Sequence, residues 1–388
     1  MTINHDALDV SDLLRDARNV SGLEDFGPTA FLEGLECYLD SLKRESGLPP
    51  AGLAMKREQL VTMLANRLRA NRIARDYPEV LEQDISCPLF IIGPPRTGTT
   101  KLQRMIASDP SLAFLRLWQS RNPVPHEGTQ IQDPDPRYEE ARARAEQMLK
   151  ETPEMFASHT YYPDDPEEEV WILEHTFLNK MMHIDVYVPS YMEWLRRQDV
   201  TRCFEELRDY FKIVQWQNKE VGKPWIIKCV LYNENIDTVL KLFPDAKFVC
   251  SHRNITDQIP SWCQLILDGR RLFKPDFDAQ LHGRDQLEQI AIDMENHIAL
   301  RKSVPADRIM DIAYKDVVSD ALGTIKKMYA FRDWQWTEQA EQSMKTWEKN
   351  NQQYKHGKRD YDLSTFGLNE ELINERFAFY NEYFADYL

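Results

Sequence analysis

The feature that most constrains the fold is a short apolar segment followed by two glycines with the spacing of a phosphate-binding loop. Residues 88–92 are apolar and end at Gly93, which is typical of a buried strand. Gly98 stands five positions after Gly93, and apolar residues recur at helical spacing over 100–108. We therefore predict a strand, a loop and a helix in that order. In this arrangement the N–H groups of the loop and of the helix N-terminus can converge on an anion.

Strand and helix segments alternate again in the second half of the chain. Strands are expected at 225–229, 247–250 and 308–312, and helices at 236–243, within 256–267, near 284–302 and from residue 317. Such alternation is typical of a parallel sheet with helices on its faces. The sequence therefore predicts an α/β fold, a parallel β-sheet flanked by helices, with helical N-terminal, inserted and C-terminal segments.

The chain contains no linker rich in Gly, Ser or Pro, so we expect a single domain over residues 1–388. An aromatic-rich insertion with acidic clusters separates the loop from the later strands. The expected parts are a helical N-terminal segment (1–85), the loop unit (86–119), the helical insertion (120–222), the rest of the α/β core (223–335) and a helical C-terminal segment (336–388).

Charge and cysteine content narrow the class of protein. Lys and Arg number 48 against 63 Asp and Glu, and the net charge of −15 argues against a nucleic-acid surface. None of the six cysteines forms a CxxC pair and no His pair has zinc spacing, so we predict reduced thiols and no metal site. No signal peptide is recognisable, and no apolar run reaches the ~18 residues of a membrane span. We expect a cytoplasmic protein that acts on a small molecule; the sequence leaves its oligomeric state open.

The loop departs from a nucleoside-triphosphate loop at one position. In that motif a Lys follows the second glycine, whereas this chain has Thr99 there and carries its cation, Arg96, inside the loop. Thr97 and Thr100 add hydroxyl donors to that of Thr99. The missing Lys disfavours an ATPase or kinase, and a nucleotide phosphotransferase on the same fold is the alternative interpretation.

The loop sequence PPRTGTT (94–100) resembles the phosphosulfate-binding loop of sulfotransferases, which has the form P-[KR]-[ST]-G-T-T. Weaker similarities to the bacterial branch extend over nearly the whole chain, for example at 117–118, 189–194 and 366–368. The resemblance implies a P-loop-like sulfotransferase fold and a reaction without a metal. The donor is then 3′-phosphoadenosine 5′-phosphosulfate (PAPS), and the product is adenosine 3′,5′-bisphosphate (PAP). The implied donor-binding residues in the loop are Pro95, Arg96, Thr97, Gly98, Thr99 and Thr100.

Further donor contacts are implied outside the loop. Arg253 follows the strand expected at 247–250, and Ser261 stands eight residues later. In the family an Arg and a Ser so placed bind the 3′-phosphate, whose oxygens suit the planar guanidinium. Tyr314 resembles the family Tyr near the adenine, and Lys358 and Arg359 are candidates for additional cations, although a solvated basic cluster is the alternative.

The residues implied for catalysis lie at the end of a strand and in the insertion. Lys228 resembles the family Lys beside the transferring sulfuryl group, and with Arg96 it would stabilise the leaving phosphate. The animal branch has its catalytic His two residues later, where this chain has Val230. The base is therefore expected from the acidic segment of the insertion, in the order Glu168, His159, Glu167.

Two departures from the family pattern keep another interpretation open. The chain has Cys229-Val230 and Asn254-Ile255 where the family usually has Ser-Pro and Asp-Pro. A repurposed, non-sulfating member of the fold is thus an alternative to an active enzyme. The acceptor is expected to be a small apolar or phenolic metabolite, held by aromatic residues that otherwise belong to the helix-packing core: Tyr161, Tyr162, Trp171, Phe177, Tyr187 and Trp194.

Overall fold

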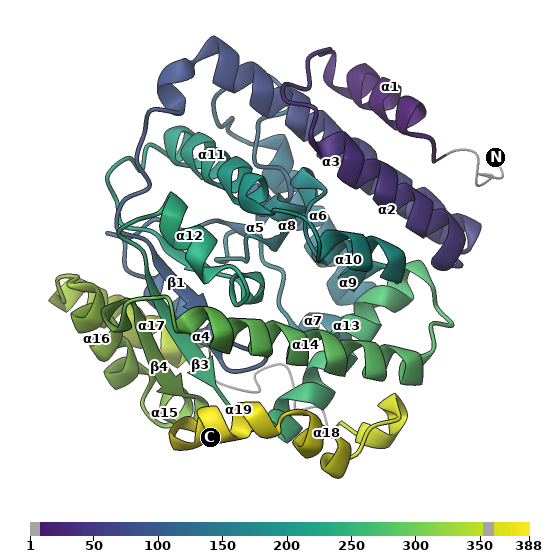
Figure 1. Ribbon diagram of the computed structural model, residues 1–388. Helices are drawn as coiled ribbons and strands as arrows, with labels where there is room; N and C mark the ends of the chain where they lie inside the picture. The colour runs from purple at the N-terminus through teal and green to yellow at the C-terminus, as the bar shows by residue number, and fades with distance from the viewer. Residues whose placement is uncertain (1–7, 352–360) are drawn as a thin grey trace.

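A computed structural model describes residues 8–351 and 361–388 (Figure 1). Its central sheet has four parallel strands in the order β2-β1-β3-β4. Their bounds are β1 Leu89–Ile92, β2 Ile226–Lys228, β3 Lys247–His252 and β4 Ile309–Ala313. Every expected strand forms, with each end within two residues of the prediction. The predicted α/β fold with a parallel sheet is confirmed.

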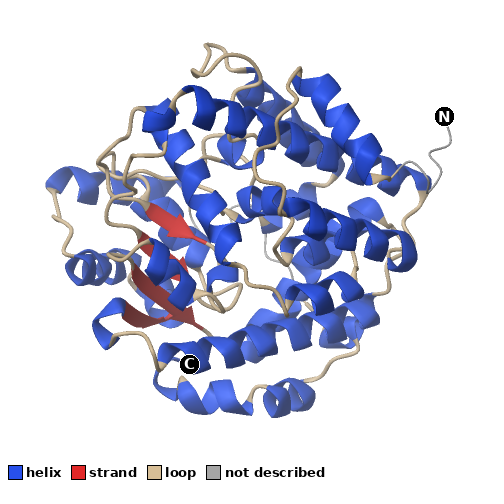
Figure 2. Cartoon of the chain, turned by 45° about the horizontal axis from the view of Figure 1, so that its top comes forward, coloured by secondary structure: helices blue, strands red, loops and turns tan. Residues whose placement is uncertain are grey.

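Helices surround the sheet, as Figure 2 shows with strands in red and helices in blue. The N-terminal helices are α1 Val10–Ser21, α2 Phe31–Glu45, α3 Pro50–Asp76 and the 3₁₀ turn η2 Pro78–Val80. Helix α4, Thr99–Ile106, follows β1. The insertion forms α5 Leu117–Arg121, α6 Pro136–Glu151, α7 Pro153–Ser158, α8 Val170–Leu173, η3 Glu174–Thr176, α9 Met181–Asp185, α10 Pro189–Leu195 and α11 Thr201–Asn218.

The later helices connect and follow the remaining strands. Between β2 and β4 lie η4 Val230–Tyr232, α12 Ile236–Leu242, α13 Ile255–Phe273, α14 Ala279–Arg301 and η5 Ala306–Arg308. After β4 come α15 Tyr314–Ser319, α16 Ala321–Arg332, α17 Glu338–Asn350, η6 Leu363–Phe366, α18 Glu370–Arg376, α19 Ala378–Tyr383 and η7 Ala385–Tyr387. In Figure 1 the C-terminal helices, in yellow, lie below α14 at the end of the molecule opposite α1–α3.

Alternate side chains of β1 pack into two different hydrophobic cores, one on each face of the sheet. Every residue of the strand is therefore apolar. Phe90 and Ile92 pack with residues of α11 and α12 on one face of the sheet. Leu89 and Ile91 pack with residues of α4, α16 and α17 on the other. All four side chains are fully buried. The loop after β1 thus starts from a fixed point at the centre of the sheet.

The sheet order places the carboxyl end of β1 at a topological switch point. Strand β2 pairs with one edge of β1. The chain then crosses over, and β3 pairs with the opposite edge of β1. In open parallel sheets, ligands bind at the carboxyl ends of strands where the order reverses in this way. Among the described residues, no helix has both the length and the apolar character needed to cross a membrane.

Candidate active site

The loop after β1 has a conformation that depends on its glycines. Gly93 and Gly98 have φ of 120° and 84°, in the region that favours glycine. A Cβ on Gly93 would lie 2.4 Å from the Ser251 carbonyl oxygen of β3, so this glycine also allows the loop to cross the neighbouring strand. Helix α4 begins directly after Gly98, and its first N–H groups therefore face the loop.

Asn233, which sequence reasoning missed, holds the start of the loop. Its carboxamide accepts a hydrogen bond from the Gly93 N–H and donates one to the Gly93 carbonyl, both at 2.8 Å. The Asn233 carbonyl in turn accepts from His297 Nδ1 at 2.9 Å. A buried Asn between η4 and α12 is a weak sequence signal, because its partner lies 140 residues away. The contact fixes the loop to the segment after β2.

The Thr97 side chain has a different role from the expected one. Its hydroxyl is fully buried and donates to the Pro94 carbonyl at 2.9 Å. Ser251 donates to the Thr97 carbonyl at 2.7 Å. The hydroxyl of Thr97 therefore stabilises the turn of the loop, which leaves its backbone N–H as the group able to face a ligand. Arg96 has φ of 65°, unusual for a residue other than glycine and typical of strained functional loops.

Arg96, Ser261, Arg253 and Tyr314 come together beside the loop. Arg96 Nε donates to the Ser261 hydroxyl at 3.1 Å, and Arg253 Nη1 donates to the Arg96 carbonyl at 3.3 Å. The Arg253 guanidinium lies 4.6 Å from the centre of the Tyr314 ring, which packs in turn against Gly98. The four residues come from the loop, from the end of β3, from α13 and from α15.

This cluster has unmet capacity for an anion. Burial lowers the pKa of Arg96, and the nearby charge of Arg253 acts in the same direction. Arg253 Nε is buried and has no hydrogen-bond partner among the described residues. Buried donors in proteins nearly always have an acceptor. An anionic ligand would supply that acceptor and offset the repulsion between the two guanidinium groups.

Lys228 lies at the end of β2, which pairs with β1 on the side opposite to β3 and Arg253. Its ammonium donates to the Thr100 hydroxyl at 3.2 Å and forms an ion pair with Glu168. Only 3% of the Lys228 side chain is exposed, so this pair is largely shielded from water. The structure thus brings together one cation and one carboxylate of the predicted catalytic set directly beside the first turn of α4.

Glu167 and His159 form a second pair close by. His159 Nε2 lies 2.8 Å from a Glu167 carboxylate oxygen. Burial alone would raise the pKa of Glu167, but His159, Arg104 and Lys228 outweigh it and lower the pKa to about 2. A carboxylate with so low a pKa is a weak base. Glu167 orients the imidazole of His159, which leaves Glu168 and His159 as the two candidates for proton removal.

Glu169 is a third acidic residue of this segment that sequence reasoning passed over. It is fully buried, and one carboxylate oxygen accepts the Lys228 backbone N–H at 3.2 Å. The other oxygen has no hydrogen-bond partner among the described residues. Burial raises the pKa of Glu169 well above its usual range, and the contact of this group with the Lys228 backbone fixes the end of β2. The sequence feature that could have indicated Glu169 is its position immediately before the apolar helix α8.

Both departures from the family pattern preserve local structure. The Cys229 sulfur accepts the Leu231 N–H at 3.3 Å and caps η4. The Asn254 carboxamide oxygen accepts the Thr256 N–H at 3.0 Å and caps α13, the helix that carries Ser261. Cys229 and Asn254 therefore stabilise the turns after β2 and β3 in place of the usual family residues. Lys358 and Arg359 lie outside the described residues.

A cavity lies beside the loop and the turn after β2. Pro95 of the loop and Val230 after β2 line it, and its walls are largely apolar, with Met192, Trp262 and Ile290 among them. None of the six aromatic residues proposed from the sequence lines this cavity. Phe177 is fully buried and packs with Trp194 in a core shared with α2 and α3. Phe177 and Trp194 therefore belong to the helix-packing core, whereas Tyr162 is exposed.

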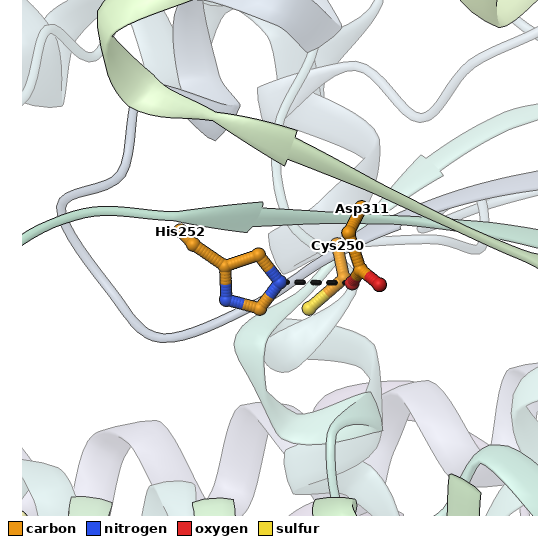
Figure 3. Close-up of side chains that lie close together, drawn as sticks. All are labelled: Cys250, His252 and Asp311. Carbon is orange, nitrogen blue, oxygen red and sulfur yellow. Dashed lines mark hydrogen bonds and ion pairs between the residues drawn. The ribbon is translucent and has the colours of Figure 1, made fainter. Parts of the chain in front are cut away.

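Cys250, His252 and Asp311 gather at the end of β3 and β4 with ligand atoms within 4.8 Å of one another (Figure 3). His252 Nε2 bonds Asp311 at 2.9 Å, and its Nδ1 bonds the Tyr380 hydroxyl at 3.0 Å. Arg301 already pairs with both oxygens of Asp311, at 2.8 and 2.5 Å. The cluster is a satisfied hydrogen-bond network that joins the sheet to α19, and a metal ion would have to displace a guanidinium.

Comparisons with known proteins agree with this geometry. The sulfotransferase family model matches residues 88–338, which include the loop, Lys228, Arg253 and Tyr314. The solved structure of sulfotransferase STF1 from Mycobacterium tuberculosis is 28% identical, with a TM-score of 0.85, and covers 97% of this chain and 100% of its own. Sulfotransferase STF9 from Mycobacterium avium shares the fold, with a TM-score of 0.87 at 23% identity over 97% of each chain. No curated protein matches the chain.

The fold places the loop and the start of α4 at the switch point of the sheet. The chain belongs to the sulfotransferase family.

Proposed function

We propose that the protein transfers a sulfuryl group from PAPS to a hydroxyl of a small apolar or phenolic metabolite. The observation that carries this proposal is the contact of Arg96 in the loop with Ser261, beside Arg253 and Tyr314. These residues belong to four separate elements of the chain. Their meeting beside an anion-binding loop supports a donor with a phosphate at each end of a nucleoside.

The donor would be held in two parts. The 5′-phosphosulfate lies against the loop, where Pro95 and Gly98 shape the backbone and Thr99 and Thr100 offer N–H and hydroxyl donors. The 3′-phosphate accepts hydrogen bonds from Arg253 and Ser261, and the adenine lies near Tyr314. Arg96 lies between the two parts, because it belongs to the loop and contacts Ser261.

Glu168 is the proposed base, with His159 as the alternative. Glu168 takes the proton from the acceptor hydroxyl, the new S–O bond forms, and the bond from sulfur to the 5′-phosphate oxygen breaks. PAP leaves with the electron pair of that bond. Lys228 and Arg96 stabilise the charge that develops on the leaving phosphate. The ion pair of Lys228 with Glu168 supports this assignment, since it holds acid–base and electrostatic groups next to Thr100.

The proposal extends to the setting of the enzyme. We propose that it works as one domain in the cytoplasm. The N-terminal helices share a hydrophobic core with the insertion, which supports a single unit. All six cysteines are free thiols, which fits a reducing compartment.

The test separates the two ends of the donor. Arg253→Ala is expected to weaken PAP binding by about 10- to 100-fold, the effect of losing charge-assisted hydrogen bonds. Binding of adenosine 5′-phosphate, which has no 3′-phosphate, is expected to change little. The measurement is calorimetric titration of both nucleotides, followed by mass detection of a sulfated phenol formed from PAPS.

Arg271→Ala is the matched control, because Arg271 is an exposed Arg near the end of the same helix, α13, that carries Ser261. Equal losses for PAP and adenosine 5′-phosphate would refute the assignment of Arg253. Saturable binding of ATP without binding of PAP would favour a phosphotransferase instead.

A further inference from the structure

The cavity beside the loop has charged groups in one part of its wall. Lys180 and Asp293 line it together with the apolar side chains. Lys180 Nζ lies 2.6 Å from Asp293 and 2.7 Å from Glu234, the residue directly after Asn233. Lys180 is only 8% exposed, and the side chains of Asp293 and Glu234 are 18% and 26% exposed, so the three charged groups are mostly buried. They come from the start of α9, from α14 and from the turn after β2.

These charges do not balance. Two carboxylates share one ammonium group, and Lys180 is the only cation within 4.0 Å of either among the described residues. Asp285, which lies behind the lining residue His183, has its own partners, Arg270 at 3.0 Å and His183 at 3.0 Å. The cluster of Lys180, Asp293 and Glu234, of which the first two line the cavity, therefore carries one negative charge in excess when both carboxylates are ionised.

Two mostly buried carboxylates that share one ammonium group repel each other when both are ionised, and protonation of one of them relieves this repulsion. Burial, together with the neighbouring Glu234, raises the pKa of Asp293 to about 7. A positively charged group in the cavity would remove the need for that proton, since two carboxylates would then face two cations. An anionic ligand would instead add a second uncompensated charge.

From the cavity and its charge balance, we infer that the acceptor carries a basic nitrogen as well as its hydroxyl. Its ammonium group pairs with Asp293, its apolar body packs on Met192, Trp262 and Ile290, and its hydroxyl lies by Val230, near Lys228 and Glu168. This inference rests on the proposed function for the position of the hydroxyl. The class of acceptor is thus an amino alcohol or amino phenol with an apolar body. Asp293 is the residue that determines its specificity.

The experiment compares two phenols that differ in one group. Tyramine has an ammonium group where para-propylphenol has a methyl group of similar size. In the complex with PAP, calorimetry is expected to show at least tenfold tighter binding of tyramine. Asp293→Asn is expected to abolish that preference, and Glu234→Gln to reduce it, because each removes the excess negative charge. Thermal unfolding of each variant verifies that it is folded.

Glu295→Gln is the matched control, since Glu295 lies on the same helix, α14, but pairs with Arg376 at the surface. It is expected to keep the preference for tyramine. Equal or tighter binding of para-propylphenol, or no binding of either phenol, overturns the inference. Binding of tyramine that depends on Asp293 without transfer of a sulfuryl group from PAPS would support the inference and refute the proposed function.

Discussion

At the scale of single residues, the site depends on which carboxylate is free to accept a proton. Glu167 holds His159, and Glu169 holds the backbone of Lys228. Glu168 alone of the three forms an ion pair with the Lys228 ammonium. In the proposed reaction, protonation of Glu168 leaves the Lys228 ammonium without its carboxylate, and the charge that develops on the leaving phosphate takes the place of that carboxylate. Three consecutive glutamates therefore have three different sets of contacts.

We expect Glu168→Gln to bind PAP normally, because the change is nearly isosteric and the loop is untouched. Its turnover on an alcohol is expected to fall by about 10²- to 10⁴-fold, the range for a lost general base. The deficit should shrink with more acidic phenols, which need less help to lose a proton. Single-turnover rates over a series of acceptors would measure this dependence.

His159→Ala is the companion variant. If it is inactive while Glu168→Gln keeps the wild-type rate and pH profile, His159 is the base. If both variants are active, the acidic segment only supports the local structure.

The sequence allowed the loop residues to be predicted because their chemistry depends on position: glycines and a cation directly after an apolar strand. The same reasoning could not find Asn233 or Glu169. Asn233 acts through a contact with Gly93, 140 residues away, and Glu169 through the backbone of Lys228, 59 residues away. Such roles arise only once the sheet has brought β1, β2 and the insertion together.

At the scale of elements, the loop is held by β3 and by the turn after β2. Asn233 clamps Gly93, and Ser251 of β3 clamps Thr97, so both halves of the loop are tied to a neighbouring strand or turn. Strands were predictable because buried parallel strands are short apolar runs. The insertion was predicted to be helical, but most of its individual helices were not located, since several span only four to seven residues, as in α8 and α10, and depend on packing.

We expect Asn233→Asp to weaken this clamp. A carboxylate cannot donate to the Gly93 carbonyl, and Asn233 is only 2% exposed, so the lost hydrogen bond leaves a buried acceptor unsatisfied. The free energy of unfolding is expected to fall by about 1–3 kcal/mol. The affinity for PAP is expected to fall as well, because the loop loses a fixed position.

Asn235→Asp is the control, since Asn235 lies in the same turn but contacts the Leu231 carbonyl and not the loop. Urea denaturation and PAP titration of both variants make the comparison. A loss of stability without any loss of PAP affinity would mean that Asn233 supports the fold but does not preorganise the loop.

At the scale of the whole molecule, the N-terminal helices are joined to the insertion by an apolar core and by buried charges. Tyr38 of α2 and Tyr191 of α10 meet edge to face with ring centres 5.5 Å apart. A Cβ on Gly34 would lie 2.3 Å from the Phe177 carbonyl oxygen, so the close approach of α2 to the insertion at this point requires a glycine. The helices that precede the loop therefore form part of the body that supports the site.

The charged part of this junction leads to a prediction for stability. Lys56 of α3 lies 3.3 Å from Asp185, and Gln59 donates to Glu174 at 3.2 Å. Glu174 is 2% exposed. Burial and the neighbouring charge of Asp185 outweigh Lys56 and Arg121 and raise the pKa of Glu174 to about 8. Folded protein thus keeps a proton on Glu174 at neutral pH, whereas the unfolded chain, with an ordinary value of 4.5, does not.

A carboxyl group with a raised pKa contributes stability that is fully present below the unfolded pKa and is lost as the pH rises through the folded one. Between pH 6.5 and 8 we expect the free energy of unfolding of the wild type to fall, relative to Glu174→Gln, by about 2 kcal/mol. Gln resembles the neutral acid and has no proton to lose, so its variant lacks this slope. Urea denaturation across that pH range, with the exposed Glu371→Gln as control, gives the difference. Parallel curves for the wild type and Glu174→Gln would mean that Glu174 is already ionised in the folded protein and that Lys56 neutralises it at the junction.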